Sequence, residues 1–325
     1  MPRLYLDSNI ISYLHHPEQY TGQEWYSCLR LIKEYIDDPA NNMVVVYSPA
    51  HLMDVRRGFA KDKQRALDKL NFLSELTHNT CIVKDITWNE VRIERRDATA
   101  FFSRDGNQFE DFLAPNGRGI NLLSVIEETG IFEKYKNIPL NYVAIAAEFA
   151  HLDMPLPRTK ENPTLYSMMC DFVENMNDLF TNGHKLYKIL RDRAKAETGI
   201  ADQALSPENP LAAIDEQLKT TEIGRRMQQI MKQSFRLDPN NREEIVGSLF
   251  MDLDLFGLKK DKLSPGHGYM SVATDANHAF FASYCHLFVT QDTRTAAKAE
   301  AVYKYLDLDI KVFDVPKLAA WFNSF

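Results

Sequence analysis

The sequence predicts an α/β fold, a three-layer α/β/α core with a parallel central sheet, interrupted by a large helical insertion. Two observations lead to this fold class. Short apolar runs typical of strands alternate with amphipathic helical stretches at both ends of the chain, whereas the middle shows helical periodicity alone. Such alternation favours a parallel sheet covered on both faces. We expect a core of residues 1–96 and 266–325, and a helical insertion or cap over residues 97–265.

The N-terminal part of this core contains two strands and the helices that follow them. An apolar strand over residues 3–6 stops at Asp7, and Asp7 or Ser8 is placed to cap a helix over residues 10–14. Ser48 and Pro49 are suited to opening the helix that carries Asp54. The remaining elements are a helix over residues 25–36, a strand over 43–47, a helix over 67–76 and an edge strand over 81–83.

The C-terminal part repeats the pattern. Residues 274–292 predict a short helix and then a buried strand, with Asp275 near the helix start and Asp292 just past the strand. A helix over residues 293–306, a strand over 310–313 and a helix from Pro316 complete the core.

Helical periodicity dominates from about residue 86 to residue 264. It is clearest over residues 143–149, 165–180 and 212–234, with proline-bearing breaks between. The insertion returns to the core through residues 265–268, just before Asp275. We therefore expect a helical cap beside the acids, which would favour a flexible single strand over a duplex or bind a partner protein.

Four aspartates are predicted to meet at one edge of the sheet. Ligands of open α/β sheets bind at the carboxyl ends of the strands, where Asp7 and Asp292 fall. Asp54 and Asp275 lie on helices expected at the same edge. Carboxylates in close proximity repel one another unless a cation holds them, and oxygen-only clusters select Mg²⁺ or Mn²⁺.

The order of these acids resembles that of the PIN-domain family of metal-dependent nucleases. The matching stretches cover residues 1–96 and 266–325. They are the apolar strand ending in Asp7, Ser8 and Asn9; Ser48 with Asp54 six residues later, where the family more often has Glu; Asp275 followed by Ala279 and Ala282; and the strand ending in Val289, Thr290, Gln291 and Asp292.

The resemblance implies a nuclease that hydrolyses phosphodiester bonds, in RNA rather than DNA, and leaves a 5′-phosphate. It assigns the catalytic and metal-binding roles to Asp7, Asp54, Asp275 and Asp292, with Mg²⁺ or Mn²⁺ as the cofactor. Asn9 and Thr290 are expected to support these ligands or to position the phosphate. Two alternatives remain: a PIN-like scaffold without catalysis that binds nucleic acid or protein, and a phosphatase of the haloacid-dehalogenase type. The phosphatase needs an acid two residues after Asp7, where this chain has Asn9.

Other polar groups are interpreted from their neighbours in the sequence. Basic residues soon after Asp54 are candidates for binding nucleic acid, namely Arg56, Arg57 and Lys61. His278 is interpreted as a hydrogen-bonded helix residue. Later basic runs, over residues 185–195 and 225–236, are interpreted as faces of surface helices, and Asp252 and Asp254 as solvated surface.

Composition narrows the class of protein. The net charge of −7 argues against general nucleic-acid affinity but allows a local basic face. The four cysteines are too far apart to suggest zinc and fit a reducing compartment. The chain has neither a signal pattern nor an apolar run long enough to span a bilayer, so we expect a cytoplasmic protein without membrane association.

Overall fold

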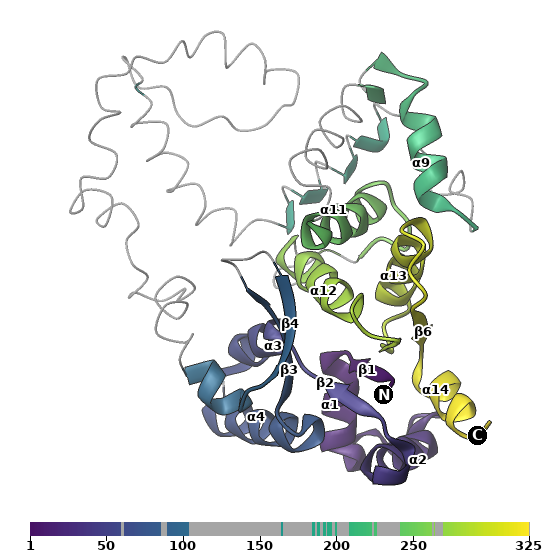
Figure 1. The fold of residues 1–325 in the computed structure, drawn as a ribbon. Coiled ribbons are helices and arrows are strands. Elements are labelled where there is room, and N and C mark those ends of the chain that lie inside the picture. Colours follow the sequence, from purple (N-terminus) through teal and green to yellow (C-terminus); the bar gives the residue numbers. More distant parts are fainter. Residues whose placement is uncertain are drawn as a thin grey trace. The chain divides into compact units, whose positions relative to one another are not determined.

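The computed structural model describes residues 1–59, 62–85, 90–103, 164, 184–185, 187–188, 191–192, 194–196, 199, 208–222, 224–225, 241–261, 263 and 269–324. Contacts divide the chain into two compact units, one formed by Met1–Phe102 with Tyr187–Phe325 and the other by Ser103–Leu186. All elements described below belong to the first unit (Figure 1).

A four-stranded parallel sheet forms the centre of this unit. Its strands lie in the order β2 (Val44–Val46), β1 (Arg3–Leu6), β5 (Leu287–Val289) and β6 (Lys311–Phe313). This confirms the predicted parallel sheet. The chain leaves β1 toward β2 on one side and returns at β5 on the other. The strand order therefore reverses between β1 and β5, which is where open α/β sheets bind ligands.

Helices cover both faces of the sheet. Leu4 and Leu6 of β1 enter one hydrophobic cluster and Tyr5 enters the other, because alternate residues of a strand point to opposite faces. The first cluster includes residues of α1 (Ser8–His15), α2 (Tyr26–Asp37), α4 (Lys63–Thr77) and α14 (Val315–Phe322). The second includes residues of α11 (Arg242–Leu255), α12 (Tyr269–Ala282) and α13 (Thr293–Tyr305), while α3 (Pro49–Phe59) contributes to both. Two covered faces are compatible with the predicted three layers.

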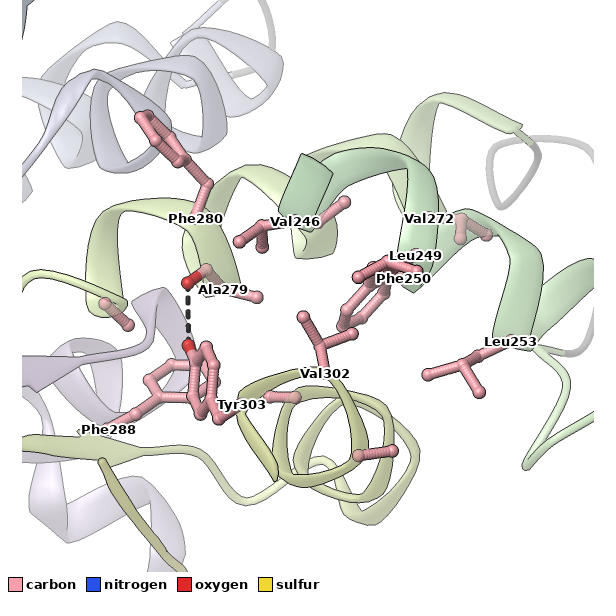
Figure 2. Packing of buried hydrophobic residues seen from close by; sticks show 14 of the residues in the cluster. Val246, Leu249, Phe250, Leu253, Val272, Ala279, Phe280, Phe288, Val302 and Tyr303 are labelled. Atoms are coloured by element: carbon pink, nitrogen blue, oxygen red, sulfur yellow. Dashed lines mark hydrogen bonds between the residues drawn. The ribbon is translucent and has the colours of Figure 1, made fainter. Parts of the chain in front are cut away.

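Helix α11 is part of this core, although it falls within the predicted insertion. Figure 2 shows Leu249 and Phe250 of α11 directed toward Val302 of α13. The Tyr303 hydroxyl donates to the carbonyl oxygen of Ala279 at 2.6 Å, which fixes α13 to α12 beside these contacts. Residues 242–255 of the predicted insertion therefore pack directly on the sheet-covering helices.

An antiparallel hairpin follows the first half of the sheet. Strands β3 (Thr80–Asp85) and β4 (Glu90–Arg95) pair along their length, and β3 meets the end of β2 where the Tyr47 amide donates to Thr80. The predicted edge strand is thus confirmed. The helical pattern expected from residue 86 is wrong at β4. Val91 and Ile93 alternate with charged residues there, which is the period of a strand.

The remaining described elements are short. They are the 3₁₀ turns η1 (Pro17–Tyr20) and η2 (Pro39–Asn41) and helix α9 (Pro210–Leu218). The single helix predicted over 212–234 is wrong in its extent, because α9 ends at Leu218 and a turn follows at Lys219 and Thr220. The helices predicted over 143–149 and 165–180 lie outside the described residues, so the cap stays a prediction. Among the helices that the structure describes, none has the length and apolar character needed to cross a membrane.

Candidate functional site

Asp7 lies at the point where the strand order reverses. It directly follows β1, and its amide donates to the Val289 carbonyl at the end of β5 at 2.8 Å. Asp7 occupies the N-cap position of α1, yet its side chain makes no capping hydrogen bond. Instead the Thr290 hydroxyl donates to Asp7 Oδ2 at 2.8 Å, and Asn9 approaches the same oxygen at 3.5 Å. Helix capping therefore does not explain why a carboxylate lies at this position. Burial raises its pKa.

Asp292 is the acid that follows β5, and its two oxygens are occupied within the chain. It caps α13 by accepting hydrogen bonds from the amides of Arg294 at 2.8 Å and Thr295 at 3.3 Å. The Arg294 guanidinium adds contacts of 3.3 Å and 3.1 Å, one to each oxygen. Although burial opposes them, these hydrogen bonds lower the pKa of Asp292.

Asp54, on α3, is paired with His278 of α12. The two side chains are 2.8 Å apart between Oδ2 and Nε2, and the Arg57 guanidinium lies 3.6 Å from the other oxygen. Burial alone would raise the pKa of Asp54, but the hydrogen bond and charge of His278 outweigh it and lower that pKa. The same pairing raises the pKa of His278 against the effect of its burial.

The His278 ring is held from within the core. It is 1% exposed, and the Tyr5 hydroxyl lies 2.9 Å from its Nδ1. Tyr5 is in turn 2.7 Å from the Ser48 hydroxyl. His51 donates from Nε2 to the Leu6 carbonyl and accepts the Ser48 amide at Nδ1, so it is neutral. Burial lowers the pKa of His51 to about 3, in agreement. The prediction that His278 is hydrogen-bonded is confirmed.

Asp275 is the acid with the fewest partners. Helix α12 begins at Tyr269, so the expectation that Asp275 lies near a helix start is wrong; the helical pattern continues through the residues before it. The Asp275 carboxylate makes no hydrogen bond or ion pair with any residue that the structure describes. Burial is the largest cause that raises its pKa, and the negative charge of Asp7 is the next. The charges of Asp261 and Asp292 raise it less, and the pKa is about 8 even though the charge of His278 lowers it.

The four predicted acids are thus neighbours, but they do not form a closed cage. Thr290 links Asp7 to the turn before Asp292, and His278 lies 2.8 Å from Asp54 and 4.0 Å from Asp7. Within the described ranges, no three acidic, histidine or cysteine side chains converge closely enough to surround a metal ion. Asp54 and Asp292 are instead neutralised by cations of the chain itself.

Sequence reasoning missed a network of buried charges beside this site. Asp254, expected as solvated surface, is fully buried and lies 2.7 Å from the ammonium of Lys298, which is also fully buried. Arg191, expected on a surface helix, is buried against the other oxygen of Asp254. Lys298 also pairs with Asp261 at 2.8 Å, and Asp261 with Arg294 at 3.2 Å. No local pattern could have revealed pairs so distant along the chain.

The basic candidates differ in position. The Arg57 side chain, 43% exposed, contacts Asp54 and Thr274 and therefore lies at the acids. Arg56 donates to the Phe102 carbonyl at 3.2 Å and stacks over the Phe102 ring. Lys61 lies outside the described residues. Lys69, not predicted, donates to the Ser12 hydroxyl of α1 at 3.0 Å and adds positive charge near Asp7 and Asp54.

Comparison of the chain with protein-family models, curated proteins and solved structures finds no match. The resemblance to PIN-domain nucleases accordingly stays a prediction made from the residues of this chain.

Proposed function

We propose that the protein is a PIN-like, metal-dependent nuclease that hydrolyses phosphodiester bonds, in RNA rather than DNA. One observation carries the proposal. Asp7 and Asp275 are neighbouring carboxylates beside the switch point of a parallel sheet, and among the residues that the structure describes neither has a cation that pairs with it alone. Burial raises the pKa of both side chains, and the charge of Asp7 raises that of Asp275 further.

The charge balance of the site singles out this pair. Asp54 is neutralised by His278 and Arg57, and Asp292 by Arg294. Among the described residues, the ion-pair partner of Asp7 is His278, whose Nε2 is 4.0 Å away and is already hydrogen-bonded to Asp54. Two buried carboxylates without matching charge are unstable when ionised, and a bound divalent ion would relieve their repulsion.

The donor set fits Mg²⁺ or Mn²⁺. These hard cations prefer oxygen ligands, and Mg²⁺ is usually held by one or two carboxylates, with water and substrate phosphate completing its shell. Asp7 and Asp275 would hold the ion, so a cage of three or four protein ligands is not required. When bound, such an ion polarises a phosphodiester and lowers the pKa of an attacking water.

The residues around the pair have supporting roles in this proposal. Thr290 fixes Oδ2 of Asp7 and so sets the direction of the carboxylate. The pairing of Asp54 with His278 holds α3 against α12, which carries Asp275. Arg57 is an exposed cation beside these acids and is suited to contact a phosphate of the substrate.

The test is cleavage of labelled single-stranded RNA and DNA of the same sequence by the full chain, with Mg²⁺, with Mn²⁺ and after chelation. We expect cleavage of RNA that chelation abolishes. Asp7→Asn and Asp275→Asn should each reduce the rate by a factor of about 100 or more, since each removes charge at the reacting centre. Asp292→Asn should have a smaller effect, because Arg294 already neutralises that carboxylate. Asp309→Asn is the matched control, because it removes the same charge from an exposed site.

Metal binding is measured in parallel by calorimetry. Asp7→Asn and Asp275→Asn should weaken it strongly, and Asp54→Asn much less, since Asp54 is paired with His278. A folded chain that binds the metal but cleaves no RNA or DNA would favour the alternative of a binding scaffold without catalysis. The pairing of Asp54 and Asp292 with cations of the chain is also compatible with a scaffold.

A further inference from the structure

Arg294 lies between Asp292 of the site and Asp261 of the charge network beside it. Its guanidinium contacts both oxygens of Asp292, at 3.1 Å and 3.3 Å, and also Oδ1 of Asp261 at 3.2 Å. Asp275 also lies close enough to interact with the positive charge of Arg294. The guanidinium therefore has the surroundings of a bound cation, with carboxylate oxygens on two sides and a third acid nearby.

The carboxylate of Asp261 is fixed independently of Arg294. Lys298, one helical turn along α13, pairs with Asp261 at 2.8 Å and with the buried Asp254 at 2.7 Å. The backbone amide of Asp261 donates to Asp254 at 3.0 Å, and Arg191 donates to the Asp261 carbonyl at 3.0 Å. Asp261 would hence keep its place if Arg294 were shortened.

Asp292 is also fixed without Arg294. Its Oδ1 accepts two backbone amides at the start of α13, and these capping hydrogen bonds do not depend on the side chain of residue 294. Removing the guanidinium would leave Asp261 and Asp292 facing each other across the space that it occupied. Like charges held at short range by separate anchors attract a cation from solution.

We propose that Arg294 is an internal counter-cation that competes with divalent metal at this acidic edge. The inference rests on the proposed function for the ion at Asp7 and Asp275. Arg294 satisfies Asp261 and Asp292 and adds positive charge near Asp275, so it limits the chain to one divalent ion of moderate affinity. Its geometry suits this role, because the planar fork of a guanidinium matches both oxygens of a carboxylate.

The experiment is a titration of the metal-free full chain with Mn²⁺, followed by calorimetry and by the electron paramagnetic resonance of free Mn²⁺. We expect one ion for the wild type. Arg294→Gln should bind Mn²⁺ about tenfold more tightly or take up a second ion, since it removes a charge-assisted competitor. Arg294→Lys keeps the charge and should stay close to the wild type. Arg30→Gln is the matched control, as it removes one positive charge from an exposed pair with Glu34 on α2.

Thermal melting supplies a second readout. Without metal, Arg294→Gln should melt below the wild type, and Mn²⁺ should raise its melting temperature by more than it raises that of the wild type. Because binding to the folded state raises the melting temperature, this shift reports affinity even if the variant is less stable.

The outcomes separate this inference from the proposed function. If the wild type binds Mn²⁺ and Arg294→Gln binds it no better than Arg30→Gln does, the inference is wrong and the nuclease proposal stands. If Arg294→Lys gains as much as Arg294→Gln, the effect is not one of charge and the inference also fails. If only Arg294→Gln binds Mn²⁺, Arg294 excludes the metal completely, which contradicts the single ion expected for the wild type and overturns both the inference and the nuclease proposal. Binding by neither chain contradicts both.

Discussion

At the scale of single residues, the acids of the site have unequal electrostatic surroundings. Pairing lowers the pKa of Asp54 and Asp292, so their charges contribute to the stability of the fold. Burial and neighbouring carboxylates raise the pKa of Asp7 and Asp275, so their charges oppose it. An acid that destabilises its own fold is expected where a ligand supplies the missing charge.

Asp275→Asn should therefore stabilise the metal-free protein at neutral pH. The folded-state pKa of about 8 exceeds the ordinary value of 3.8, so the folded chain binds the extra proton and wild-type stability decreases as pH rises between these values. Near neutral pH the gain should be about 1 kcal/mol or more in the free energy of unfolding, measured with urea.

The control for this prediction is the pH dependence of the stability difference. The stability difference between Asp275→Asn and wild type should be small near the lower of the two pKa values and increase toward the higher. A difference that does not change with pH would mean that Asp275 is not destabilised by its charge. Added Mn²⁺ should reverse the order of stability, because only the wild type keeps both carboxylates.

At the scale of elements, the features that could be predicted from the sequence are those that a local pattern of residues determines. Strands β1 and β5 are short apolar runs that stop at polar residues, so Asp7 and Asp292 could be placed at the edge of a sheet. Strand β4 was missed because Val91 and Ile93 give a weak alternation among charged residues. The start of α12 was missed because apolar and small residues extend the helix before Asp275.

The ion pairs of the site could not be predicted in this way. His278 and Asp54 are separated by 224 positions, and Lys298 and Asp254 by 44, so each pair exists only once the helices pack. An isolated buried lysine or aspartate gives no signal in the sequence. Their partners follow from the three-dimensional arrangement alone.

The prediction at this scale concerns the stability that helix α11 contributes to the core. Phe250 is fully buried among residues of α12 and α13 (Figure 2). Phe250→Ala should cost about 3–5 kcal/mol, because it removes a large apolar side chain and leaves a cavity. Glu244→Ala, at an exposed position of the same helix, should change stability by less than about 0.5 kcal/mol. Chemical denaturation measures both, and equal small losses would show that α11 is not part of the core.

At the scale of the whole molecule, alternating charges connect the site to a distant part of the chain. The sequence of contacts runs from Asp292 through Arg294, Asp261, Lys298 and Asp254 to Arg191. Arg191 belongs to the first compact unit, shortly after the segment Ser103–Leu186 ends. The boundary that preserves these ion pairs therefore lies before residue 191, not at residue 265.

Two deletions distinguish these boundaries. Replacing Ser103–Leu186 with a flexible Gly/Ser linker should leave a chain that unfolds cooperatively and keeps the metal affinity of the full protein, because the first unit retains α11 and all the ion pairs named above. Replacing residues 97–265 should destroy the fold. That deletion exposes the apolar faces of α12 and α13 and leaves Lys298 buried without Asp254 and Asp261, a loss of about 3–5 kcal/mol for the broken pair alone. Circular dichroism melts and Mn²⁺ titrations measure both results. If the larger deletion gave a stable, metal-binding core, residues 97–265 would be a separable insertion, as the sequence first suggested.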